Sequence, residues 1–115
     1  MNPANLIRGQ TYYRLTFSDT DLTIPGVYPL VFVGLVQTED DEGEVYCFQD
    51  TVSFVRFGYV TEYTGEEVLA AVFVPEPDLG SIYNLEGIAS EIQNALNRVK
   101  DRGEPMLKHL KGPWI

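Results

Sequence analysis

One cysteine, Cys47, and one histidine, His109, are the residues of this chain that could form a nucleophilic dyad. A thiol nucleophile needs a base within hydrogen-bond reach, and His109 belongs to the C-terminal tail. Cys47 stands between Tyr46 and Phe48, where a cysteine is usually a small buried hydrophobe. We therefore assign no catalytic residue, and the sequence favours a protein that is not an enzyme.

Acidic side chains gather at two places that could attract a hard cation, Asp19-Thr20-Asp21 and Glu39–Glu44. A calcium loop needs ligands at fixed spacings around a glycine at its sixth position. The first cluster continues into Leu22-Thr23-Ile24-Pro25, which lacks those ligands, and the second is too short. A zinc site would need more than one cysteine and one histidine. No glycine-rich phosphate loop precedes a helix. We expect no metal and no cofactor.

The seven tyrosines are the best hint of a binding site. Tyrosine suits surfaces that are half buried and half wet, so a cluster could line a recognition groove. The alternative is that these residues simply favour strands and pair across them. A carboxylate beside such a groove could act as an acid or a base if burial shifts its pKa. The candidate binding residues are Tyr12, Tyr46, Asp50 and Tyr59.

The elements that must position these residues are short strands, expected within about residues 11–74. Tyr13, Leu15 and Phe17 alternate with polar or amphipathic neighbours, which is the period of a strand. Residues 22–29 contain Pro25-Gly26 and Pro29 and are expected to be an irregular connection. Gly34 indicates a bulge or bend within the second strand. The further strands are expected at residues 30–36, 45–49, 52–57 and 68–74.

One helix is expected at about residues 82–102, after a break at residues 75–80 that contains two prolines. Ser81 or Asn84 can cap its start, and Gly103 can end it. A basic tail, residues 103–115, follows. Apolar residues recur at helical spacing and form one stripe. They are Leu85, Ile88, Ile92, Ala95, Leu96 and Val99.

These elements predict an α+β protein with a single domain over residues 1–115. An antiparallel sheet of about five strands, strongly bent or closed into a partial barrel, would pack against the C-terminal helix. Residues 8–74, five short strands with an acidic hairpin, resemble SH3-like small barrels in general shape. The Ala-Leu-Tyr-Asp-Tyr opening and the paired tryptophan of SH3 domains are absent. The resemblance therefore concerns shape and does not extend to peptide binding.

The net charge of −9 is unevenly distributed. Residues 1–97 carry 15 acidic and 3 basic side chains, and residues 98–115 carry 5 basic and 2 acidic ones. Because residues 1–97 are strongly acidic, they repel the phosphate backbone of nucleic acids, and we expect no nucleic-acid partner. No segment has the length of a membrane span, and the start lacks the apolar run of a signal peptide. With its single cysteine, the chain is predicted to be a soluble cytoplasmic protein.

Three functions fit these features. The first is a non-enzymatic protein-interaction domain that binds a protein partner or associates with itself. The second is a small-molecule-binding protein or small enzyme that uses a carboxylate, Asp50, in a tyrosine-lined pocket. The third is an acidic inhibitor or immunity-type protein that binds a basic target, which rests on charge alone.

Overall fold

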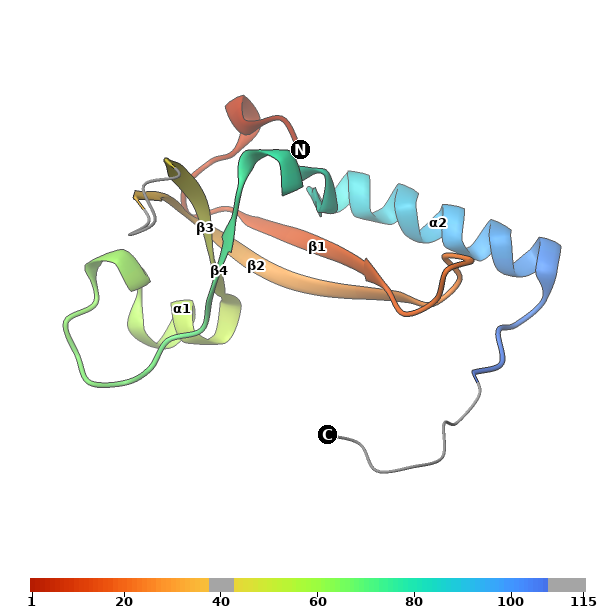
Figure 1. The fold of residues 1–115 in the computed structure, drawn as a ribbon. Helices are drawn as coiled ribbons and strands as arrows, with labels where there is room; N and C mark the ends of the chain where they lie inside the picture. The colour runs from red at the N-terminus through yellow and green to blue at the C-terminus, as the bar shows by residue number, and fades with distance from the viewer. Residues whose placement is uncertain (38–42, 108–115) are drawn as a thin grey trace.

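A computed structural model describes residues 1–37 and 43–107 and shows an open, five-stranded antiparallel sheet with a long C-terminal helix beside it (Figure 1). The strands lie in the order β4-β3-β2-β1-β5. The α+β prediction is confirmed, and the sheet is not closed into a barrel. In chain order the elements are η1 (Pro3–Asn5), β1 (Thr11–Phe17), β2 (Pro25–Gln37), β3 (Glu44–Asp50), α1 (Thr51–Phe57), η2 (Val60–Glu62), β4 (Ala71–Val74), η3 (Glu76–Ser81), β5 (Ile82–Tyr83) and α2 (Leu85–Arg102).

Strand β2 begins earlier than expected, because residues 25–29 are a strand and not an irregular connection. Pro29 lies opposite Tyr13, and Pro25 lies opposite Phe17. The Phe32 amide donates to Gln10, on the β1 side, so the alternation of a strand turns the nitrogens of residues 25 and 29 away from β1. Strand β3 pairs with β2 only from Leu30 onward, so neither proline removes a ladder hydrogen bond.

The segment expected as a fourth strand, residues 52–57, is instead the helix α1. The Asp50 carboxylate accepts a hydrogen bond of 2.9 Å from the Ser53 amide and so caps the first turn. Gly58, at φ 75°, ends the helix by donating its amide to the Phe54 carbonyl. These caps prevail over the strand preference of valine and phenylalanine. The fifth predicted strand is shorter than expected and covers only Ala71–Val74.

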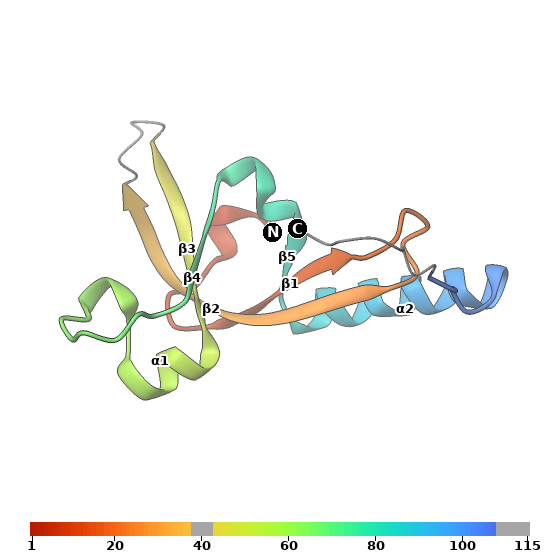
Figure 2. The same ribbon diagram turned by 60° about the horizontal axis from the view of Figure 1, so that its bottom comes forward.

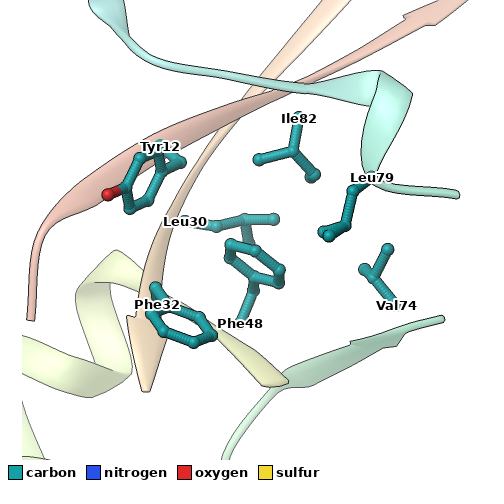
Figure 3. Packing of buried hydrophobic residues seen from close by; sticks show 7 residues of the cluster. All are labelled: Tyr12, Leu30, Phe32, Phe48, Val74, Leu79 and Ile82. Carbon is teal, nitrogen blue, oxygen red and sulfur yellow. The ribbon is translucent and has the colours of Figure 1, made fainter. Parts of the chain in front are cut away.

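The core is divided between the two faces of the sheet, because successive side chains of a strand point to opposite faces. On one face, under η1 and η3, lies the cluster shown in Figure 3: Tyr12, Leu30, Phe32, Phe48, Val74, Leu79 and Ile82. On the other face Val31, Val33 and Cys47 pack against the α1–η2 segment. Figure 2 shows η1 and η3 on one side of the sheet and both helices on the other. The bulge expected at Gly34 is present, at φ 133°.

Helix α2 ends where its sequence predicts but begins at Leu85, three residues later than expected, because Ile82–Tyr83 form the short strand β5. The Asn84 side chain accepts a hydrogen bond of 2.8 Å from the Gly87 amide. Gly103, at φ 89°, donates its amide to the Val99 carbonyl and ends the helix. The helix lies along β1 and β5. Only two residues of its predicted apolar stripe, Ile88 and Ala95, are buried, so the sheet covers less of this stripe than expected.

Candidate interaction surface on α2

Two of the predicted binding tyrosines lie at the core cluster of Figure 3: Tyr12 is a member of it, and Tyr46 packs against it. Tyr12 is 1% exposed, and its hydroxyl accepts from the Ile7 amide and donates to the Asn5 carbonyl. This side chain therefore fixes the N-terminal segment against β1. Tyr46 is half-buried and packs against Phe32, with 6.1 Å between the ring centroids.

The other two predicted residues lie elsewhere. Tyr59 packs on the opposite face of the sheet against Phe54, and the Arg8 guanidinium lies 3.7 Å from its ring centroid. The Asp50 side chain caps the first turn of α1. The structure therefore does not bring the four residues into one pocket, and each has a packing or capping role where it stands. A binding role for them stays a prediction.

The acidic residues near the β1–β2 turn are used within the fold. Asp19 accepts hydrogen bonds from the Thr23 hydroxyl and from the amides of Thr23 and Ile24. These bonds, the hydroxyl's first, hold the pKa of the Asp19 carboxyl below its ordinary value. Asp21 forms an ion pair of 3.0 Å with Arg102. Over residues 1–37 and 43–107, no three His, Cys, Asp or Glu side chains form a group that could hold a metal ion.

Of the two residues that could form a nucleophilic dyad, Cys47 and His109, the structure describes only Cys47. Cys47 is 1% exposed, and burial raises the pKa of its thiol, which keeps the thiol protonated and unreactive. His109 and most of the predicted acidic loop, residues 38–42, lie outside the described residues.

One face of α2 is apolar and uncovered. Leu85, Ile92 and Leu96 are 66%, 37% and 45% exposed, and the small Ala89 between them is also exposed. Residues three and four apart lie on the same side of a helix, so these four form a continuous line. We call Leu85, Ala89, Ile92 and Leu96 the α2 seam. The half-buried Val99 continues its spacing.

The seam lies beside the face of α2 that packs on the sheet. Ile88 and Ala95, which the sheet buries, border it on one side. Glu86, Gln93 and Lys100 border it on the other side, at equal intervals of seven residues, and all three are exposed. The sequence showed the apolar stripe, but it held no signal for which half of the stripe the sheet would leave open.

Contacts with the β1–β2 turn hold the far end of α2 in place. Arg98 donates to the Leu22 carbonyl at 3.0 Å, and its guanidinium lies 5.7 Å from the Phe17 ring centroid. The Arg102–Asp21 ion pair lies one turn further along the helix. The seam is therefore presented on a helix whose start follows β5 and whose end contacts the β1–β2 turn (Figure 1).

A second surface feature is a hollow of about 280 Å³ on the face of the sheet that carries Tyr12. Its walls are Arg14, Thr16, Tyr28, Leu30 and Val72. The Arg14 Nε atom is buried and has no hydrogen-bond partner among the described residues. A guanidinium beside apolar walls is suited to a carboxylate with an apolar body.

Comparison with known proteins adds no relative, since no protein-family model, no curated protein and no solved structure matches the chain. The fold and the α2 seam together describe an α+β protein with an uncovered apolar helix face. No helix within residues 1–37 and 43–107 is long and apolar enough to cross a membrane.

Proposed function

We propose that this protein is a non-enzymatic protein-interaction domain that binds a helix of its partner along the α2 seam. The observation that carries the proposal is the exposure of Leu85, Ile92 and Leu96 on a capped, anchored helix. Large apolar side chains that are exposed singly are ordinary, but a contiguous line of them on one helix face indicates an interaction site.

The spacing of the seam favours a helix as the binding element. From Leu85 the steps along the chain to Ala89, Ile92, Leu96 and the half-buried Val99 are four, three, four and three residues. An average of 3.5 residues per turn keeps a line of side chains facing a second helix, as in a coiled coil. Ala89 is small enough to let the partner helix approach closely.

The cytoplasmic location of the protein stays a prediction.

Photo-crosslinking tests this function directly. A photoreactive phenylalanine analogue replaces Leu96 in the seam, and a matched control carries it at the neighbouring exposed Asn97. The proposal expects the probe at position 96 to crosslink to a helical segment of one protein, whether a second copy or another chain. Equal or absent crosslinking at positions 96 and 97 would count against it.

A specific observation favours a second function, the binding of a small carboxylate ligand. The buried Arg14 Nε faces no acceptor among the described residues and borders the hollow that Tyr28 and Leu30 line. Isothermal titration with aromatic and branched aliphatic carboxylates tests this alternative. Binding that Arg14→Met abolishes would support it, and equal heats for the variant and the unchanged protein would remove it.

A further inference from the structure

Resting on the proposed function, we infer that the partner helix is α2 of a second copy of this chain, packed antiparallel along the seam. The first observation is charge. Helix α2 carries three acidic side chains (Glu86, Glu91, Asp101) and three basic ones (Arg98, Lys100, Arg102), so it is neutral within a chain of net charge −9. Two copies can meet at this helix without the repulsion that their other surfaces exert.

The second observation is the order of the charges beside the seam. Glu86 stands near the start of the helix, Gln93 at its middle and Lys100 near its end. In an antiparallel pair related by a two-fold axis, Glu86 faces the partner's Lys100, and the two Gln93 side chains face each other. Each contact then occurs twice, as the symmetry of an isologous dimer requires.

The same arrangement brings the apolar residues into register. Ile92 of one copy lies beside the partner's Leu96, and Ala89 lies beside the partner's Val99. The two helices then overlap along their full length, so large side chains meet at the centre and the small alanine meets a larger residue at each end. The flanking charges and the apolar layers therefore select the same alignment.

A parallel pair fits less well. It would bring the two Glu86 side chains to one end and the two Lys100 side chains to the other, and it would align the two helix dipoles. The residues on the other side of the seam cannot offset this repulsion, because Ile88 and Ala95 are apolar and buried against the molecule's own sheet. Only Glu86, Gln93 and Lys100 therefore flank the seam on a side that the partner helix can contact.

The association is expected to be weak. A contact made by one helix from each copy is smaller than the roughly 1,600 Å² of a standard interface. We expect dissociation constants at or above the micromolar range, so the dimer should appear only in concentrated solution.

Charge exchange across the pair tests both the partner and the direction. Glu86→Lys or Lys100→Glu alone replaces two attractions by two repulsions and should weaken self-association roughly 3–30-fold, as measured by sedimentation equilibrium. The double variant Glu86→Lys/Lys100→Glu should recover most of that loss. An equimolar mixture of the two single variants should form a heterodimer. Asp101→Lys is the matched control, because it makes the same change in net charge as Glu86→Lys away from the seam.

The outcomes separate the inference from the proposed function. Weakening by each single variant, with recovery in the double variant and in the mixture, would support the antiparallel dimer. The inference would be overturned if the strength of self-association were the same in the charge-exchange variants as in the unchanged protein. An equal change in Asp101→Lys would also overturn it. A chain that stays monomeric at millimolar concentration would also overturn it. Crosslinking from position 96 to a different protein would then leave the proposed function intact, and no crosslink from that position would remove both.

Discussion

The buried amide of Gln49 should hold the α1–η2 segment on the sheet, and its replacement by leucine tests this. The Gln49 side chain is fully buried. Its Nε2 donates to the Ser53 hydroxyl at 3.1 Å and to the Gly58 carbonyl at 2.9 Å. Its Oε1 accepts from the Val60 amide at 2.8 Å. One side chain therefore joins the end of β3 to both ends of the segment that follows.

The expected magnitude follows from the partners that Gln49→Leu leaves behind. The Ser53 hydroxyl keeps its bond to the Asp50 carbonyl, but the Gly58 carbonyl and the Val60 amide lose their side-chain partner. A polar group left unsatisfied costs about 1–3 kcal/mol. Gly58 and Val60 are only half-buried, so water reduces that cost, and the added apolar side chain offsets part of it. We expect a net loss of about 1–4 kcal/mol from the free energy of unfolding.

Urea denaturation followed by circular dichroism measures this loss. With a slope of about 1–3 kcal/mol per molar urea, the midpoint should fall by roughly 1 M. Hydrogen exchange at the Val60 amide should accelerate in the same variant. Gln37→Leu is the matched control, because Gln37 is exposed at the end of β2 and its change should stay within about 0.5 kcal/mol. Equal midpoints for Gln49→Leu and Gln37→Leu, with unchanged exchange at Val60, would refute the role given to Gln49.

Three further predictions concern the ends of elements and the response to acid. Asp50→Ala removes the cap of α1 and should lower the free energy of unfolding by about 0.5–2 kcal/mol, whereas Asp50→Asn should retain most of it in the same urea assay. Gly103→Ala should cost about 1–3 kcal/mol, because φ 89° with ψ 168° strains any side chain. Gly80→Ala, with open space around its Cβ and no positive φ, should leave the melting temperature unchanged, and an equal loss for both glycines would contradict the assignment. The Asp19 carboxyl has a lowered pKa in the folded protein, so the stability it contributes is present above its unfolded pKa and is lost as the pH falls through the folded one. Unfolding midpoints measured on an acid series should show a smaller loss over that window for Asp19→Asn, and an identical profile would show that Asp19 takes no part.

Short apolar or alternating runs made much of the fold predictable. They correctly indicated β1, the buried part of β2, and β3, while Asn84, one of two candidate caps, and Gly103 mark the ends of α2. Local strand preference failed at α1. The signal that could have found this helix was Asp50, a capping residue that stands directly before the apolar run.

The candidate surface could be predicted only in part. The apolar stripe of α2 was visible from its spacing, but its division into a buried and an exposed half depends on how the helix is rotated about its own axis where it packs on β1 and β5. The role of Gln49 was hidden for a similar reason, since its partners at Gly58 and Val60 lie across a turn that the sequence did not reveal. Tyr12 and Tyr46 lie in strands, as the strand preference of tyrosine suggests, but Tyr59 stands directly before η2 and lies in a different cluster from Tyr12.

The most direct test of the central claim, association through the α2 seam, is a dilution series followed by nitrogen-15 NMR. On concentration from tens of micromolar to millimolar, amide shifts should change for residues 85–100 and should stay constant on the far face of the sheet, at Phe48 and Val74. The variant Leu96→Glu should abolish these changes while the melting temperature remains near that of the unchanged protein, because Leu96 is already 45% exposed. Concentration-dependent shifts that lie elsewhere, or shifts that persist in Leu96→Glu, would contradict the account.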